Sequence, residues 1–280
     1  MFKKKKDQTY QSYWSISWNI FKKNKVAMVC LFIVILLCLI ALFAPLIAPY
    51  DPNKQVLTDR LMKPCGQHWF GTDDLGRDIF SRIIYGCRVS LSVGIISQII
   101  ATVIGYTMGV CAGYYGGKVD SVISFLIQVF SSFPFLLFAM AIMFVLGPGL
   151  INLYLALGLL GWASTARLIR GDVMRLKKME YIDACKVSGG NSFRIIMKHL
   201  LPNCLSTLIV TVTLGIPNAI MSEASLSFLG LGVKAPMASW GSMISFSQPY
   251  IRSATYYSVI PGLAIIITVL AVSYTHLTLP

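Results

Sequence analysis

Charged residues are scarce in this chain. They make up 12% of its 280 residues, whereas hydrophobic residues make up 56%. An average soluble domain contains about 25% charged and about 45–50% apolar residues. A chain of this size and composition cannot hide its apolar surface in one soluble core, so secreted domains and ordinary cytosolic enzymes are poor candidates. Lipid is expected to cover much of the surface.

Acidic residues are the rarer kind of charge, which leaves a formal net charge of +13. Residues 1–25 contain seven Lys and one Asp, and residues 167–202 contain eight basic and three acidic residues. Residues 49–87 are balanced, with five of each sign. The positive-inside rule places the two basic segments in the cytoplasm. Topology then accounts for eleven of the thirteen net charges, so nucleic acid is not expected as a partner.

Motifs of several catalytic classes are missing. The run ending in Gly117-Lys118 is not a phosphate loop, because Ala112 stands in place of the first Gly and Val119 in place of Ser or Thr. No Ser lies in a Gly-x-Ser-x-Gly elbow. Three scattered histidines have no metal-ligand spacing: His68, His199 and His276. The chain is therefore not expected to be an enzyme, to hydrolyse ATP by itself, or to bind a metal or cofactor.

Long uncharged runs, by contrast, are abundant. The 23 residues from Val26 to Ala48 contain no charge, and a helix of that length spans a hydrocarbon core of about 30 Å. The sequence predicts an all-α polytopic membrane protein with its N-terminus in the cytoplasm and six spans: 26–48, 89–112, 119–146, 150–167, 203–226 and 255–274. Gly147-Pro148-Gly149 divides two spans. Pro134 and Pro217 suggest kinks, although a packing role explains them equally well.

This pattern divides the chain into four parts: a basic N-terminal segment (1–25), the first span with an external segment (26–87), a core (88–272) and an atypical end (273–280). In the first part, Trp14, Trp18 and Phe21 are spaced for one face of an interfacial helix, although a basic flank with aromatic anchors explains them equally well. Cys65 and Cys87 lie outside the membrane, either as a disulfide or as two thiols.

The external segment contains a turn-rich motif: Gly71, Thr72, Asp73, Gly76, Arg77 and Asp78. Thr72 or Asp73 can cap the helix that follows. An acidic cluster of this kind can also bind a cation, but a capped, solvated turn needs the same residues and is the preferred interpretation. The motif is therefore expected to be structural.

The loop 168–202 predicts two short amphipathic helices. Tyr181, Ala184, Cys185 and Ser188 share one face of the first helix. Gly189-Gly190 can end it in a left-handed turn, and Asn191 or Ser192 can cap the second. The second helix places these residues on one apolar face: Phe193, Ile196, Met197, Leu200 and Leu201. Docking into a groove on a soluble partner and resting on lipid are equally compatible with this pattern.

Glu223 is the one acid within the predicted fifth span. An ionisable residue in a span is a functional candidate because its desolvation is costly. Since Glu223 lies near the outer end of the span, solvent access or a backbone hydrogen bond is favoured over a proton relay.

Three runs of the chain, 68–78, 180–203 and 222–232, resemble the C-type permease subunit of oligopeptide, dipeptide and nickel ABC importers, over roughly residues 12–272. The runs are His68-Trp69-Phe70-Gly71-Thr72-Asp73-Asp74-Leu75-Gly76-Arg77-Asp78, then Glu180-Tyr181-Ile182-Asp183-Ala184-Cys185 with Gly189 and His199-Leu200-Leu201-Pro202-Asn203, and finally Ser222-Glu223-Ala224-Ser225-Leu226-Ser227-Phe228-Leu229-Gly230-Leu231-Gly232.

This resemblance implies a type I importer permease fold in the cytoplasmic membrane of a bacterium. It also implies four partners: a homologous B-type permease, two ATPases that bind ATP and Mg, and an extracytoplasmic substrate-binding protein. The ATPase-coupling loop would contain Glu180, Asp183, Ala184, Cys185, Gly189, His199 and Pro202. Glu223 and Ser225 would belong to a gate or pathway.

The chain departs from the family pattern at a few positions. Asp183 replaces the usual Glu and Cys185 the usual Ala, changes that keep the charge sign or the small size. Residues 273–280 do not match the family's usual tail and are expected to be a truncated or spliced-in end. Dipeptides, longer peptides and nickel remain open as cargo. A secondary transporter or a membrane enzyme would need charged residues near the bilayer midplane or convergent titratable groups, and the spans contain almost none.

Overall fold

The computed structural model describes residue 22 and residues 24–277. Regular structure within this part of the chain is helical, apart from an isolated bridge between Thr72 and Asp78. Trp14, Trp18 and Phe21, on which the interfacial-helix interpretation depends, lie outside the described residues, as do residues 278–280. The all-α prediction is confirmed.

Five helices form the body: α2 (Lys25–Leu42), α4 (Ile79–Tyr115), α7 (Leu150–Leu176), α10 (Leu201–Phe228) and α12 (Thr255–Leu277). Shorter helices connect them: α3 (Ala44–Ile47), α5 (Gly117–Ser132), α6 (Phe135–Leu146), α8 (Glu180–Val187), α9 (Ser192–Ile195) and α11 (Trp240–Ser247). Two 3₁₀ turns, η1 (Leu57–Asp59) and η3 (Gln248–Tyr250), and one π-helical turn, η2 (Ile196–Leu200), complete the described chain.

Four helical stretches of the described chain are long and apolar enough to cross a membrane: Lys25–Leu42, Ile79–Tyr115, Ser192–Phe228 and Thr255–Tyr274. Helices α5 and α6 become a fifth if the pair, bent by 91°, is one span. The remaining segment of the six predicted from sequence is α7, in which the 17 residues from Leu150 to Ala166 precede the first charge at Arg167. Its apolar part is therefore at the lower limit for a span.

The two prolines predicted to kink spans behave differently. Pro134 stands at the break between α5 and α6, where Phe133 before it is extended. That conformation is expected because the proline ring disfavours a helical backbone in the preceding residue. Pro217 lies inside α10, which continues on both sides of it. The Pro134 kink is thus confirmed and divides the third predicted span.

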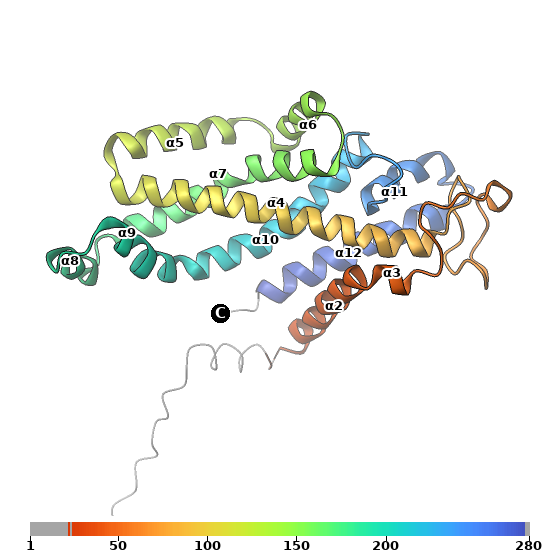
Figure 1. The fold of residues 1–280 in the computed structure, drawn as a ribbon, viewed down its shortest axis with the longest axis horizontal. Coiled ribbons are helices and arrows are strands. Elements are labelled where there is room, and N and C mark those ends of the chain that lie inside the picture. Colours follow the sequence, from red (N-terminus) through yellow and green to blue (C-terminus); the bar gives the residue numbers. More distant parts are fainter. Residues whose placement is uncertain (1–21, 23, 278–280) are drawn as a thin grey trace, which may run out of the picture.

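The long helices α4, α7 and α10 run lengthwise through the molecule (Figure 1). Helices α8 and α9 lie at one end, whereas α11 and residues 48–78, here called the cap segment, lie at the other. Helices α2 and α12 pack against each other beside α4 and α10. The two loops that the charge pattern assigned to opposite sides of a membrane thus occupy opposite ends.

No disulfide bond links the described parts of the chain. All seven cysteines are free thiols in the structure. Cys65 is exposed, while Cys87 is buried with its Sγ 3.5 Å from the carbonyl oxygen of Leu37. Of the two alternatives for this pair, two thiols are found.

Helices α4 and α7 approach closely along a stripe of glycines. Gly105, Gly109 and Gly113 repeat every four residues on α4 and face α7. A Cβ on Gly109 would lie 2.7 Å from the carbonyl oxygen of Ala166, and one on Gly113 would lie 2.8 Å from the Cβ of Val173. Small residues are the usual way for helices in lipid to gain van der Waals contact, because lipid removes the hydrophobic drive to associate.

Replacing Gly109 by Ala is expected to lower the thermal midpoint of the detergent-solubilised protein. The added methyl group must push α4 away from the α7 backbone, and overpacking of this kind costs about 1–3 kcal/mol. Gly171→Ala on α7 is the matched control, because nothing lies within 4 Å of its Cβ position. Equal midpoints for the two variants, measured by fluorescence-detected size exclusion after heating, would contradict close α4–α7 packing.

Candidate functional site

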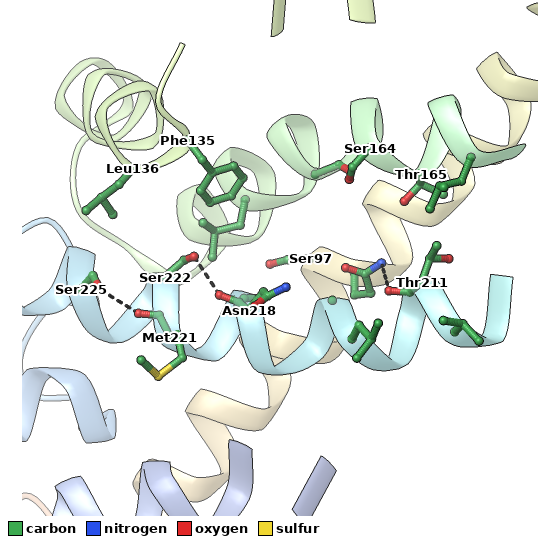
Figure 2. A pocket seen from close by; sticks show the side chains of 18 residues that line it. Ser97, Phe135, Leu136, Ser164, Thr165, Thr211, Asn218, Met221, Ser222 and Ser225 are labelled. Atoms are coloured by element: carbon green, nitrogen blue, oxygen red, sulfur yellow. Dashed lines mark hydrogen bonds between the residues drawn. The ribbon is translucent and has the colours of Figure 1, made fainter. Parts of the chain in front are cut away.

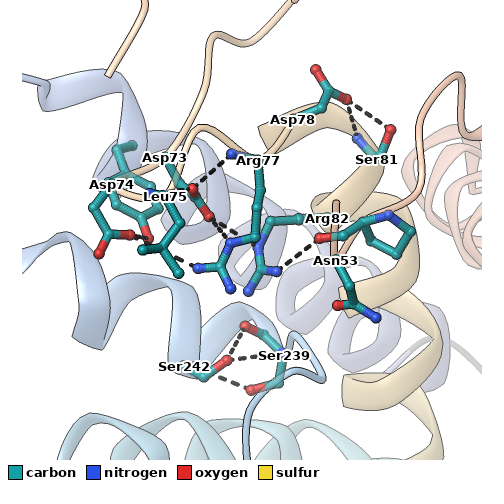
Figure 3. Close-up of polar contacts among 12 residues, drawn as sticks. Asn53, Asp73, Asp74, Leu75, Arg77, Asp78, Ser81, Arg82, Ser239 and Ser242 are labelled. Carbon is teal, nitrogen blue, oxygen red and sulfur yellow. Dashed lines mark hydrogen bonds and ion pairs between the residues drawn. The ribbon is translucent and has the colours of Figure 1, made fainter. Parts of the chain in front are cut away.

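The cap segment is built around the carboxylate of Asp73, which is fully buried. Its Oδ1 accepts hydrogen bonds from the backbone amides of Leu75 and Arg77, both at 2.9 Å. Its Oδ2 lies 2.6 Å from Nε of Arg77 and 3.4 Å from Nε of Arg82 (Figure 3). Arg82 also donates to the carbonyl oxygen of Pro52 at 2.9 Å. One carboxylate thus joins the cap segment to α4.

The residue that caps α4 differs from the prediction. Thr72 or Asp73 was expected at this position, but the N-cap is Asp78, whose Oδ2 accepts from the backbone amide of Ser81 at 2.8 Å. Thr72 is used elsewhere, since its hydroxyl donates to the carbonyl oxygen of Asp59 and accepts from the amide of Met62. The sequence expectation was wrong because both side chains make other contacts in the cap segment. Asp73 pairs with arginine, and Thr72 bonds to backbone groups.

Two glycines of the motif let the cap segment fold on itself. Gly71 and Gly76 both have positive φ, at 77° and 69°. A Cβ on Gly76 would lie 1.8 Å from the carbonyl oxygen of Val56, so no larger residue fits. No three metal-ligating side chains converge anywhere among the described residues, and Asp73 is already paired with arginine.

Tyrosine hydroxyls of residues 250–257 form hydrogen bonds with the cap segment. Tyr257 on α12 donates to Oδ1 of Asp74 at 3.1 Å, and Tyr256 donates to the carbonyl oxygen of Met62 at 2.9 Å. Arg60 reaches the hydroxyl of Tyr250 at 2.9 Å. The predicted structural motif is therefore the centre of a cap that joins α4 and α12.

The loop at the opposite end has the predicted helix–turn–helix form. Helix α8 ends in a paired set of hydrogen bonds, from the amide of Gly189 to the carbonyl of Lys186 and from that of Gly190 to the carbonyl of Cys185. Gly189 has a φ of 80°, the left-handed conformation typical of this helix end. Asn191 caps α9 by accepting from the amide of Arg194 at 2.8 Å. The left-handed turn and the Asn191 cap are confirmed.

Buried apolar residues anchor this loop to the long helices. Ile182 and Ile195 lie in a core with Ile169, Val173 and Leu200. The opposite faces are open: Val187 is 89% exposed and Phe193 is 71% exposed. Asp183 and Lys186 pair at 2.7 Å on this open side, and the hydrogen bond raises the pKa of Lys186 above its usual range.

The predicted apolar face of the second helix is not a single face. Leu200 is buried, but Phe193 and Met197 are exposed, and Ile195 takes the inward position instead. The π-helical turn η2 has a wider winding, which shifts the residues after Ile195 around the helix axis. His199 lies in this turn beside Tyr181, with ring centroids 6.1 Å apart, and Pro202 stands in the first turn of α10. Helices α9 and α10 thereby form one continuous stretch.

Glu223 is fully buried, so the expected solvent access is wrong. Its Oε1 accepts from the hydroxyls of Ser227 and Ser239, at 2.7 Å and 2.6 Å. Ser90 on α4 lies 3.5 Å from Oε2 and also accepts from the amide of Trp240. Because Ser239 is the N-cap of α11, the carboxyl group joins α10, α4 and the start of α11.

A cavity of about 630 Å³ lies between α4, α6, α7 and α10 (Figure 2). The polar side chains that line it are Ser97, Gln98, Ser164, Thr165, Thr211, Asn218, Ser222 and Ser225. The described lining residues include no charged side chain. Ser225 was a sequence candidate and does line the cavity, whereas Glu223 points away from it into the α11 contact.

Sequence reasoning missed most of this cavity. Ser97 and Gln98 on α4 and Asn218 on α10 are neutral polar residues inside predicted spans, and that property was the available signal. It is weak because serine and threonine in a span commonly bond to their own helix backbone. Which of them share a cavity depends on how the helices pack.

The fold is that of a transmembrane subunit of an ABC importer. The structure is similar to an inward-facing structure of the MetNI methionine ABC transporter, with a TM-score of 0.56 over 69% of this chain and 92% of that chain. The sequence identity is 19%, so the likeness establishes the fold alone.

The chain belongs to the family described as binding-protein-dependent transport system inner membrane component, which matches residues 102–278. Residues 12–64 match the N-terminal transmembrane domain of oligopeptide transport permease C. The dipeptide transport system permease protein DppC of Bacillus subtilis is 44% identical over 88% of this chain and 77% of its own length. The oligopeptide permease OppC of the same organism is 41% identical, covering 88% and 80%.

A third relative, the glutathione transport system permease protein GsiD of Pectobacterium atrosepticum, is 38% identical over 95% of this chain and 89% of its own length. Members of this family are the transmembrane components of ABC transporters and lack the ATPase domain. The chain is accordingly a multi-pass permease of the bacterial inner membrane, and ATP is hydrolysed by partner subunits.

Replacing Asp73 by Ala is expected to loosen the cap segment. The change removes the carboxylate that pairs with both Arg77 and Arg82 and leaves Arg77 only its 3.8 Å contact with Asp74. Removing one partner of a buried ion pair costs about 3–5 kcal/mol. Limited proteolysis of residues 48–78 and the thermal midpoint measure the effect. Asp51→Ala, at an exposed position of the same segment, is the control. Equal protease resistance in the two variants would show that Asp73 does not hold the cap segment.

Replacing Glu223 by Gln is expected to be tolerated, because the amide oxygen still accepts from Ser227 and Ser239. Glu223→Ala should lower the thermal midpoint, since each buried hydroxyl left without a partner costs roughly 1–3 kcal/mol. Thermal midpoint and uptake are measured together. Loss of uptake in Glu223→Gln at normal membrane abundance would mean that transport needs the carboxyl group itself and not its hydrogen bonds.

Proposed function

We propose that this chain is the C-type permease of an ATP-driven importer of di- or oligopeptides. The observation that carries the proposal is the uncharged cavity between the long helices, lined by both apolar and polar side chains, in a chain that also has an exposed helical loop at one end. The relatives named for dipeptide, oligopeptide and glutathione transport favour peptides. Nickel is disfavoured, because the cavity lining described contains no His, Cys or carboxylate.

The topology follows from the charge pattern. Helices α2, α4, the bent pair α5–α6, α7, α10 and α12 serve as six spans in a type I importer fold. The basic residues 1–25 and the loop 168–202 face the cytoplasm. The cap segment and α11 then face outward, and the permease core covers residues 88–272. Residues 273–277 continue α12, and no role is assigned to residues 273–280.

The cavity serves as this subunit's half of the pathway. It is lined from α4, α6, α7 and α10, with Ser225 at one end of the lining on α10. A homologous B-type permease encloses the other half. A wall of apolar and neutral polar groups lets peptides with side chains of either charge pass without a tightly bound ion pair.

The loop at the cytoplasmic end serves as the coupling element. Helix α8 presents Glu180, Asp183 and Ala184 on its exposed side, and it fits a cleft in one of two ATPase subunits that bind ATP and Mg. The end of α8 and the turn after it contain Cys185 and Gly189. The connection from this loop to α10 contains His199, and Pro202 lies in the first turn of α10. Since α9, η2 and α10 are one continuous stretch, movement of the ATPase reaches the cavity directly.

A binding protein outside the membrane delivers the peptide at the end that holds the cap segment and α11. The rigid attachment of the cap segment to α4 and α12 supports this assignment, because a docking platform must keep its shape. Lipid covers the outer faces of α2 and α12, where Phe32 and Leu270 are exposed.

A secondary transporter is the alternative from another class. Such a protein would move its cargo on a coupling ion and would place charged residues near the midplane. The described residues that line the central cavity include none. An exposed helical loop that is anchored by Ile182 also has no use in a carrier without an ATPase.

The Gly189 turn provides the test. In the purified importer reconstituted with its permease, ATPase and binding-protein partners, Gly189→Val should reduce ATP-dependent peptide uptake at least about tenfold, because the left-handed turn costs a β-branched residue about 1–2 kcal/mol and redirects α9. Gly189→Asn is the control, since Asn tolerates this conformation. Both variants should co-purify with the other permease.

Two results would contradict the proposal. Unchanged uptake in Gly189→Val would show that the turn does not transmit ATPase movement. Recovery of the wild-type chain without ATPase partners, together with uptake that needs no ATP, would replace the importer by the secondary transporter.

A further inference from the structure

Ser97 differs from the other hydroxyls of the central cavity. Three buried side-chain atoms of the described residues have no hydrogen-bond partner: Nε of Arg82, Oγ of Ser97 and the hydroxyl of Tyr106. Arg82 has a carboxylate 3.4 Å away. Of the three residues, Ser97 is the one that lines the cavity, and it is 2% exposed.

Four neighbouring hydroxyls of the cavity lining are already used. Ser164 and Thr211 donate to backbone carbonyls three residues earlier in their own helices. Ser222 and Ser225 donate to the carbonyls of Asn218 and Met221 four residues earlier (Figure 2). These bonds consume the donors, so the groups offer the cavity an acceptor at most. Ser97 keeps both a donor and an acceptor.

The position of Ser97 fits a point of contact for cargo. It stands midway along α4, with 18 residues to each end of the helix. Asn218 lines the same cavity from α10, and its side chain is exposed. Gln98 closes the wall beside Ser97 by donating to the carbonyl of Thr211 at 3.3 Å across to α10. The site thus presents hydrogen-bonding groups without charge.

We propose that Ser97, with Asn218 across the cavity, forms a binding subsite for the backbone amide group of a passing peptide. The inference rests on the proposed function and names what this pathway recognises. A hydroxyl can accept from a peptide N–H and donate to a peptide C=O, and these groups occur in every peptide whatever its side chains. Recognition at this point is therefore by backbone and not by side chain.

The test compares a peptide with its N-methylated form. Wild-type and Ser97→Ala importers, reconstituted with the same partners, are supplied with saturating binding protein carrying either alanyl-alanine or its analogue methylated at the peptide nitrogen. We expect Ser97→Ala to reduce the amount of alanyl-alanine taken up per ATP hydrolysed about three- to tenfold, the range expected for one hydrogen bond. The methylated analogue keeps its C=O but has lost the N–H that donates to Ser97, so Ser97→Ala should reduce its uptake less. Comparing two permeases with one binding protein cancels the binding protein's own preference.

Two controls separate a subsite from a structural role. Ser164→Ala removes a hydroxyl on the same wall that donates to its own helix, and it should leave the uptake of both peptides unchanged. Ser97→Ala should not lower the thermal midpoint, because the hydroxyl it removes has no partner in the protein. A lowered midpoint would show a structural hydrogen bond and overturn the subsite.

The remaining outcomes are equally decisive. Equal reduction of both peptides by Ser97→Ala, or no reduction of either, would overturn the subsite and leave the importer intact. A wild-type importer that takes up neither peptide with ATP would overturn the proposed function, and the subsite with it.

Discussion

A polar side chain that is buried away from water, in the protein interior or in the membrane, must find its hydrogen-bond partners within the protein. This constraint accounts for the way the protein treats its buried polar side chains. Asp73 is surrounded by two arginines and two backbone amides, and Glu223 by three serines. Both carboxylates hold segments that are remote in sequence, so the groups most costly to bury also determine which segments meet.

Helix α4 is the element on which these contacts converge. Arg82 near its start holds the cap segment, Ser90 faces Glu223 and the start of α11, and Ser97 lines the cavity. The glycine stripe in its second half, from Gly105 to Gly113, receives α7. A displacement of α4 would therefore be felt at the cap, at the cavity and along α7, which suits a helix in a protein that moves between conformations as nearly rigid parts.

The two ends of the molecule are stabilised by different means. The cap segment is tied by charges and hydrogen bonds, such as the Asp74–Tyr257 contact. The loop at the other end is held by the apolar anchors Ile182 and Ile195 and shows Val187 and Phe193 to its surroundings. An apolar anchor leaves the open face available for a partner, whereas the cap directs its polar groups inward.

Local features of the chain were determined by the sequence alone. Uncharged runs predicted the long helices, the Pro134 break and the Gly189 turn followed from backbone sterics, and three motifs identified the family. These features depend on neighbours within a few residues. The exact helix cap did not follow, because Asp78, Thr72 and Asp73 compete for the same role and their long-range contacts decide.

Tertiary structure alone decided the site. Glu223 meets Ser90 across 133 positions of sequence, and Gln98 reaches Thr211 across 113. Ile195 is buried and Phe193 is exposed, against the apolar face that the simple helical period predicts. The unpartnered hydroxyl of Ser97 exists only because four helices enclose it. Whether a side chain is buried, and which hydrogen-bond partner it finds, depends on how the helices pack. Neither can be derived from the sequence of one helix.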